Sequence, residues 1–146
     1  MKTIGRLFLL LLFCPLSSFP QYFLNAAGGV TVDEALSVAT TSAGASYSTG
    51  YFTSSGNFGP TTLTSAGLTD GFIAKTDANG NFLWAHHFGG SGIDKGICLA
   101  IDSLENSYVG IAFENTITIG SGTFTAFGLR DILIAKYDAA GNFLWA

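Results

Sequence analysis

The chain has 146 residues, of which 48% are hydrophobic, 14% aromatic and only 11% charged. This composition excludes an intrinsically disordered protein, because disorder requires low hydrophobicity and a high net charge. Ten acidic residues against six lysines and arginines give a net charge of −4 without a basic stripe, which argues against nucleic acid as a partner. Nineteen glycines and thirteen phenylalanines favour short strands joined by tight turns, so we expect an all-β fold.

Residues 1–20 have the pattern of an export signal peptide. Lys2 and Arg6 precede an apolar run from Leu7 to Phe13, and Pro15 ends that run. A membrane-spanning helix needs about 20 apolar residues, so cleavage is favoured over a retained anchor, and no membrane association is expected afterwards. Loss of two positive charges brings the mature net charge to about −6. We expect a secreted or cell-surface protein.

The two cysteines fit this interpretation. Cys14 is the residue that a lipoprotein signal would modify, but Phe13 occupies a position where that motif requires a small residue. Cys98 would be the single cysteine after cleavage, which excludes an intramolecular disulfide in the mature chain.

Residues 28–88 have the alternation of β-strands. Strands are predicted at Ala35–Thr40 and Ser46–Thr53, and a short ribbon at Thr61–Ser65. The next strand begins at Asp70, and an Asp-Ala-Asn-Gly turn then leads into a returning strand, residues 81–88. The alternative is a helix over residues 34–40, but no apolar stripe of helical length is present. The unit is therefore predicted to be a four-stranded meander.

This unit is repeated in tandem. The string D-x-x-I-A-K-x-D-A-x-G-N-F-L-W-A begins at Asp70 and again at Asp131, an offset of 61 residues. About 25 of roughly 58 overlaid positions are identical, which is far above chance. Residues 28–88 form the first repeat, and residues 89–146 a second, truncated one.

Tandem units of four strands at this period are typical of β-propellers. The repeated string is followed by G-G-S-G-x-D-x-G at Gly89, A-I-D-S at Ala100 and S-Y-V-G at Ser107. Together these strings resemble the SBBP-type β-propeller repeat of secreted bacterial proteins, notably those of Bacteroidetes. The resemblance implies four-stranded blades of a larger propeller outside the cell. The first repeat departs from the pattern at residues 41–44, where the usual D-S-x-G-N turn is absent.

Two consequences concern the ends of the chain. Residues 21–27, leading into two glycines, resemble a degenerate last strand of a blade, and we expect them to close the propeller. Cleavage before Gly28 would contradict this expectation. Two repeats leave one apolar face bare on each side, so we expect an incomplete propeller that needs further repeats or self-association.

One calcium candidate stands out among possible ligands. The motif ending at Asp94 matches a calcium-binding turn, in which carbonyl and carboxylate oxygens hold the ion. Such sites share each ion among several consecutive motifs, whereas this motif occurs once, so an inter-blade turn is preferred. His86 and His87 are expected to point to opposite faces of a strand, so they cannot chelate one metal ion together without a third ligand. No cofactor or metal is expected.

Other reactive or aromatic side chains have structural interpretations. Cys98 lacks a histidine partner in register and is not expected to be a nucleophile. Trp84 and Trp145 could stack on sugars, but their fixed place in the repeat favours packing between blades. Asp77 and Asp138 recur in turns and are expected to bind backbone groups there. The residues predicted to have structural roles in the repeat are Asp70, Gly80, Trp84, Asp131, Gly141 and Trp145.

Two functions are consistent with the sequence. The first is a non-catalytic scaffold whose exposed loops bind a protein or a glycan. The second is the propeller portion of an exported hydrolase or carbohydrate-binding protein whose active site lies elsewhere. We favour the first, because overlaying the repeats shows no unique acid, base and nucleophile, and neither a phosphate-binding loop nor a G-x-S-x-G elbow occurs.

Overall fold

The computed structural model describes residues 26–146, so the predicted signal peptide lies outside the described residues. The fold is all-β, with 61% strand and antiparallel sheets, and residues 26–146 contain no helix. In particular, no helix of a length and hydropathy suited to crossing a bilayer occurs within them. The helical alternative for residues 34–40 is wrong, because this segment forms strand β1, Asp33–Thr40.

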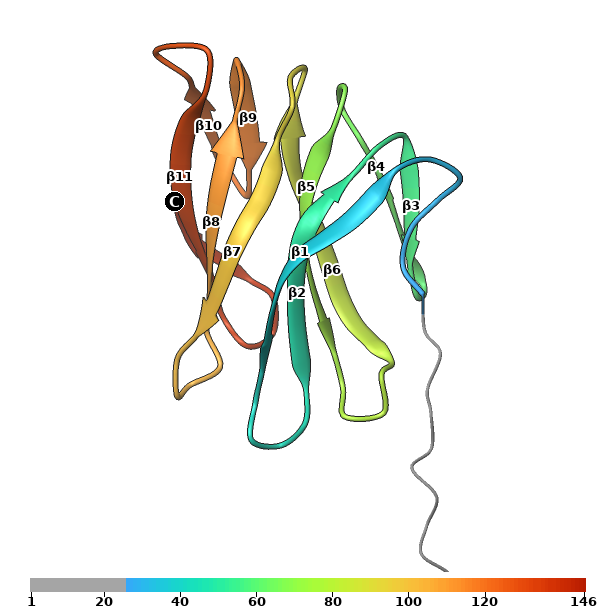
Figure 1. Ribbon diagram of the computed structural model, residues 1–146. Helices are drawn as coiled ribbons and strands as arrows, with labels where there is room; N and C mark the ends of the chain where they lie inside the picture. Colours follow the sequence, from blue (N-terminus) through green and yellow to red (C-terminus); the bar gives the residue numbers. More distant parts are fainter. Residues whose placement is uncertain (1–25) are drawn as a thin grey trace, which may run out of the picture.

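The first unit is an antiparallel meander that carries a two-stranded ribbon (Figure 1). Hydrogen bonds join its main strands in the order β1-β2-β5-β6, and the ribbon β3-β4 is inserted between β2 and β5. The bounds are β2 Ser46–Phe52, β3 Ser55–Phe58, β4 Thr61–Thr64, β5 Asp70–Thr76 and β6 Phe82–Gly90. Sequence alternation had predicted the main strands, but not β3 as the partner of β4.

The second unit has the same arrangement. Its main sheet has the order β12-β11-β8-β7, and its ribbon is β9-β10. The bounds are β7 Lys95–Ile101, β8 Ser107–Phe113, β9 Thr116–Ile119, β10 Gly122–Thr125, β11 Asp131–Tyr137 and β12 Phe143–Trp145. Strands β2 and β8, and likewise β5 and β11, begin 61 residues apart, which is the offset of the repeated string.

Strand β6 connects the two units. It runs through Gly89 and Gly90, which pair with Thr118 and Ile117 of β9. These glycines were predicted to belong to a turn, but both accommodate close approaches: an added Cβ on Gly90 would collide with the carbonyl oxygen of Thr116. A bridge between Gly28 and Asn57 occupies the equivalent place in the first unit, 61 residues earlier. Each ribbon therefore pairs with the segment that precedes its own unit.

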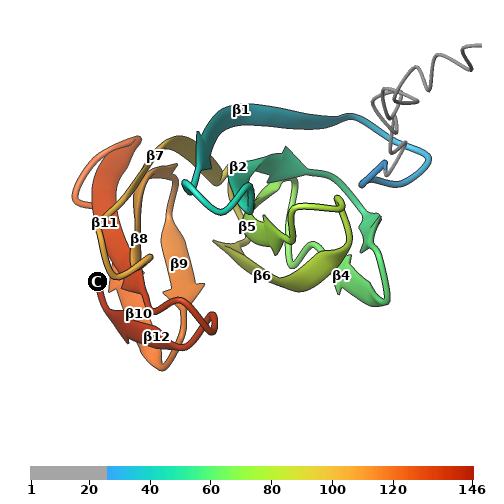
Figure 2. The ribbon, with the colours of Figure 1, turned by 90° about the horizontal axis from the view of Figure 1, so that it is seen from below.

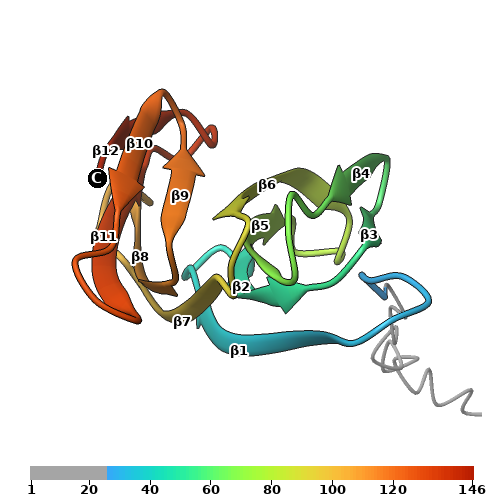
Figure 3. The same ribbon diagram turned by 90° about the horizontal axis from the view of Figure 1, so that it is seen from above.

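The two units lie side by side, with β7 against β1 and β2 (Figures 2 and 3). The first core lies inside the first unit, between its ribbon and its main sheet, and includes Phe52, Phe58 and Phe72. The second core contains the same positions of the second unit and also spans the contact between the units, where Ile73 and Phe88 are completely buried. Burial of these side chains holds the units together.

The hairpin turns use aspartate side chains to hold the backbone. Asp77 accepts hydrogen bonds from the backbone N–H of Asn81 (2.8 Å) and from its side-chain amide (2.9 Å), and Asp138 binds Asn142 in the same way. These bonds lower the pKa of both carboxyl groups. Gly80 and Gly141 adopt φ of 80° and 88° in these turns, a conformation that favours glycine.

Candidate functional site

The contact between the units is built from a cluster of three side chains on the first unit. Tyr47, Lys75 and Trp84 lie on neighbouring strands and face two turns of the second unit. Lys75 Nζ donates to Glu105 Oε2 (2.8 Å) and to the carbonyl oxygen of Ala139 (3.2 Å). The Tyr47 hydroxyl donates to the carbonyl oxygen of Glu105 (2.9 Å), and the Trp84 indole N–H donates to that of Ala139 (3.3 Å).

The contacts of Lys75 favour the charged form of its ammonium group. Partial burial is the largest single effect and lowers the pKa of Lys75, but hydrogen bonds and charge interactions with Glu105 and Tyr47 together outweigh burial and raise the pKa above its usual value. Lys75 Nζ also lies 4.8 Å from the centre of the Tyr47 ring, and the Tyr47 and Trp84 rings meet edge to face at 5.8 Å. The cluster therefore presents a positive charge and two hydrogen-bond donors to its neighbour.

Apolar residues complete the contact. Ile73 and Phe88 of the first unit pack with Val109 and Ile111 of the second. The ring of Phe88 covers Gly71, where an added Cβ would collide with it, and approaches Gly96 of β7. The site thus combines a buried apolar centre with polar contacts at one end, which is the usual composition of a specific protein interface.

The second unit carries the equivalent surface, uncovered. We call it the open face, and it comprises Cys98, Ala100, Tyr108, Gly110, Ala112, Ile132, Ile134, Lys136 and Trp145. Ile73 is 0% exposed in the first unit, whereas its equivalent Ile134 is 56% exposed. Much of the open face lines an apolar groove of about 680 Å³.

The side chains of the open face are already arranged as in the first unit. Lys136 Nζ lies 4.9 Å from the centre of the Tyr108 ring, and the Tyr108 and Trp145 rings meet edge to face at 6.2 Å. The carboxylate of Asp102 accepts a hydrogen bond from the Tyr108 hydroxyl (3.2 Å) and lies 3.8 Å from Lys136 Nζ. Lys136 is therefore held less tightly than Lys75.

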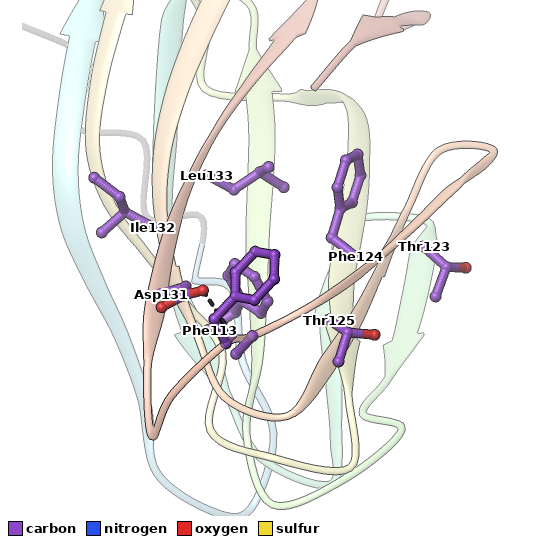
Figure 4. A pocket seen from close by; sticks show the side chains of 9 residues that line it. Phe113, Thr123, Phe124, Thr125, Asp131, Ile132 and Leu133 are labelled. Carbon is purple, nitrogen blue, oxygen red and sulfur yellow. Dashed lines mark hydrogen bonds between the residues drawn. The ribbon is translucent and has the colours of Figure 1, made fainter.

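A second groove lies at the end of the open face nearest the ribbon (Figure 4). Its volume is about 500 Å³, and it is lined by Phe113, Phe124, Asp131, Ile132 and Leu133 among others. In the first unit, the end of β6 occupies the equivalent position beside β5, because these two strands pair as far as Gly71. Strand β12 pairs with β11 only at Lys136 and Tyr137.

Asp94, the calcium candidate, uses its carboxylate to bind the backbone. Its two oxygens accept hydrogen bonds from the N–H groups of Gly90 (2.8 Å) and Glu114 (3.2 Å). Asp33 binds the equivalent N–H groups of Gly29 (2.6 Å) and Thr53 (3.3 Å) in the first unit. In residues 26–146, no group of three or more His, Cys, Asp or Glu residues is placed to hold a metal ion.

We therefore expect chelation of divalent cations to leave the melting temperature unchanged. The oxygens that calcium would need already accept backbone N–H donors. Thermal unfolding with EDTA and with added CaCl₂ tests this. A calcium-dependent rise in melting temperature that Asp94→Asn abolishes would show that the ion binds there after all.

Asp94 is also expected to impose a pH dependence on stability. Burial raises its pKa to about 6, although the N–H groups of Gly90 and Glu114 oppose the shift. Between pH 4 and 6 the folded chain then holds a proton that the unfolded chain has lost, so the free energy of unfolding falls as pH rises, by about 2–3 kcal/mol. Urea denaturation across pH 4 to 7 measures this slope.

The Asp94→Asn variant should lose that slope, because its side chain does not ionise. Asp33→Asn is the matched control, since it removes one acceptor oxygen from the equivalent turn and leaves Asp94 in place. Asp77 and Asp138, whose pKa values are lowered, titrate below this pH window. An unchanged slope in Asp94→Asn would contradict the assignment.

The two adjacent histidines lie on opposite faces, as predicted. His86 stacks between Trp84 and Tyr137, with ring centres 5.4 Å and 5.9 Å away. His87 Nδ1 lies 3.0 Å from Asp70 Oδ2. The structure thus gives the two rings separate partners, and they do not form a shared metal site.

The predicted structural residues occupy equivalent places in both units. Asp70 accepts hydrogen bonds from the Ser65 hydroxyl (2.9 Å) and the Ala66 N–H (3.2 Å), and Asp131 accepts one from the Phe127 N–H (2.9 Å). Trp84 contacts the second unit, as described above. Trp145 and Cys98 both lie exposed on the open face.

Sequence reasoning missed Glu105 and the side chains that bind it. One signal was present: the first repeat has Gly44 where the second has Glu105, and both positions adopt positive φ, 87° and 61°. An L-residue in this conformation costs about 1 kcal/mol or more, so a glutamate in place of glycine indicates a compensating contact. That contact is the ion pair with Lys75.

Comparison with known proteins gives no identification: no family model matches the chain, and no curated protein matches it.

Proposed function

We propose that this chain is part of a secreted, non-catalytic β-propeller protein of the SBBP-repeat kind, in which each unit is one blade. Its function would be that of a binding scaffold, with exposed loops that recognise a protein or a glycan. The repeated string, the 61-residue offset of the strands and the side-by-side packing of the units all support this proposal.

The main support for a non-catalytic role comes from the hydrogen bonds that four aspartate carboxylates make. Asp33 and Asp94 bind equivalent backbone N–H groups in the two units. Asp77 and Asp138 likewise hold equivalent turns. We would expect a catalytic carboxylate in only one of the two units. These four carboxylates instead bind backbone N–H groups at equivalent positions of both units, which is a structural role.

An exposed apolar residue favours binding over catalysis. Leu104 lies in the turn between β7 and β8, and its side chain is 75% exposed. Solvent-exposed apolar loop residues are common at recognition surfaces. Ligands would meet the chain at this turn.

A glycan array combined with a panel of hydrolase substrates tests the proposed function. The expected result is binding of a protein or glycan without turnover of any substrate. A Leu104→Ala variant should weaken binding if the turn between β7 and β8 takes part. Hydrolysis that follows the purified chain through chromatography would contradict the non-catalytic assignment.

Export is tested separately by sequencing the amino terminus of the secreted chain. We expect the mature protein to start at residue 21, so that residues 21–27 are retained as a strand. A start at Gly28 would remove that strand and overturn its proposed role in closing the propeller.

A further inference from the structure

The contact between the units defines what kind of surface the open face would bind. Ile73 and Lys75 lie on one side of β5, and Ile134 and Lys136 occupy the same positions in β11. The first pair is covered by the second unit, and the second pair is exposed or half-exposed. The open face is therefore a second copy of a surface whose partner is visible in this structure.

The covered surface shows which chemistry the partner must have. Lys75 requires a carboxylate, supplied by Glu105, and Trp84 requires a backbone carbonyl, supplied by Ala139. Ile73 requires apolar side chains, supplied by Val109 and Ile111. A partner for Lys136, Trp145 and Ile134 needs the same three features in the same arrangement.

A second copy of this chain does not offer those features on its first unit. The positions equivalent to Glu105, Val109 and Ile111 are Gly44, Ser48 and Gly50. The first unit therefore lacks the carboxylate and both apolar side chains. The second unit has the carboxylate and both apolar side chains. In this chain, however, these side chains already contact the first unit.

The loop before β11 supplies an independent observation. In the first unit, Thr69 of the equivalent loop exchanges hydrogen bonds with the segment that enters the second unit: its N–H donates to Gly92 (3.3 Å), and its carbonyl accepts from the Asp94 N–H (2.9 Å). Gly67 touches that segment so closely that an added Cβ would collide with Gly90, whereas Gly128, its equivalent, has nothing within 4 Å. The segment that enters the second unit leaves no room for a side chain at Gly67, whereas nothing in this structure crowds Gly128.

We propose that the open face binds a further repeat of the second unit's type, through an ion pair between Lys136 and a carboxylate at the position of Glu105. Ile132 and Ile134 pack against apolar residues at the positions of Val109 and Ile111. Trp145 donates its indole N–H to the turn carbonyl, and the loop containing Gly128 receives the entering segment. This inference rests on the proposed scaffold function and names the partner of one of its surfaces.

The test compares the full chain with a chain in which residues 86–146 are appended after Ala146. This addition keeps the 61-residue offset, so Glu105 is copied into a third unit. The copied Phe88 is replaced by alanine, because Ile132 stands at the position equivalent to Gly71, where the Phe88 ring leaves no room for a Cβ. Cys98 of the open face reports docking, with the copied cysteine replaced by serine, the residue present at the equivalent Ser37. Labelling of Cys98 by a maleimide is expected to slow several-fold in the longer chain, because Ser37 is half-buried beneath the second unit.

Lys136→Met provides the specific readout. In the three-unit chain it should lower the melting temperature by about 2–4 °C, and in the two-unit chain it should change little. Replacing the copied Glu105 by glutamine should have the same effect, and the two changes combined should add almost nothing further. Lys95→Met is the control, since Lys95 lies over the Tyr51 ring at the existing contact and affects both chains alike.

Unchanged labelling of Cys98 together with an unchanged effect of Lys136→Met would overturn the proposal. Sedimentation of the two-unit chain as a dimer that Ile134→Asp converts to a monomer would also overturn it, since the partner would then be a second copy. Hydrolase activity would contradict the proposed function and would leave the docking result as it stands.

Discussion

Replacement of Phe88 by alanine is expected to lower the free energy of unfolding by about 3–5 kcal/mol. The side chain is 0% exposed and lies at the contact between the two units, over Gly71 and close to Gly96. Both of these neighbours are glycines, so neither has a side chain that could move into the space that the ring leaves. The loss is a large part of the 5–15 kcal/mol that a folded domain usually has, and urea denaturation followed by tryptophan fluorescence measures it.

Phe127→Ala is the matched control for this prediction. Its ring is 103% exposed in the loop before β11, so its removal should change the free energy of unfolding by no more than about 0.5 kcal/mol. Equal losses in the two variants would mean that Phe88 is not packed between the units in solution.

The strands could be predicted from the sequence because their signals are local. Alternating residues indicate β2 and β8, and the Asp-x-x-Gly-Asn turns indicate the hairpins β5-β6 and β11-β12. The strand β3 and the extension of β6 through Gly89 and Gly90 could not be predicted in this way, because both depend on pairing between segments far apart in the sequence.

The repeat also limits what the sequence alone can predict about a site. Tyr47 and Tyr108 are the same residue at equivalent positions of the two repeats, yet one is completely buried and the other lines a groove. Ser46 and Ser107 also occupy equivalent positions. The Ser46 hydroxyl shares a hydrogen bond with the Thr76 hydroxyl (2.6 Å). The Ser107 hydroxyl is buried without a hydrogen-bond partner, because Tyr137 stands at the position equivalent to Thr76. Which copy of a residue is covered depends on its neighbours in space.

Several positions that differ between the repeats lie at the contact between the two units. Glu105 replaces glycine and forms an ion pair with Lys75 across the contact. Val109 and Ile111 replace small or polar residues and form its apolar centre. Identical positions such as Ile73 and Lys75 form one side of the contact, and the substituted positions supply the other side and so determine which unit that surface can bind.

Ile73 and Ile134 allow this dependence on neighbours to be measured with one substitution. Ile73→Ala is expected to lower the free energy of unfolding by about 2–5 kcal/mol, because the side chain is 0% exposed in the core between the units. Ile134→Ala removes the same atoms from the same position of the equivalent strand, where the side chain is 56% exposed, and should cost less than about 1 kcal/mol. Both variants lose the same intrinsic preference for β-structure, so the difference between them isolates the contribution of the neighbouring unit.

Urea denaturation of both variants, followed by circular dichroism at several protein concentrations, provides the measurement. A difference of at least about 2 kcal/mol that does not vary with concentration would agree with an open face on the second unit. Similar losses in both variants would show that Ile134 is buried in solution, and a loss that shrinks on dilution would identify self-association as the cause. A covered Ile134 would contradict the open face, whereas an exposed one leaves it available for the further repeat proposed above.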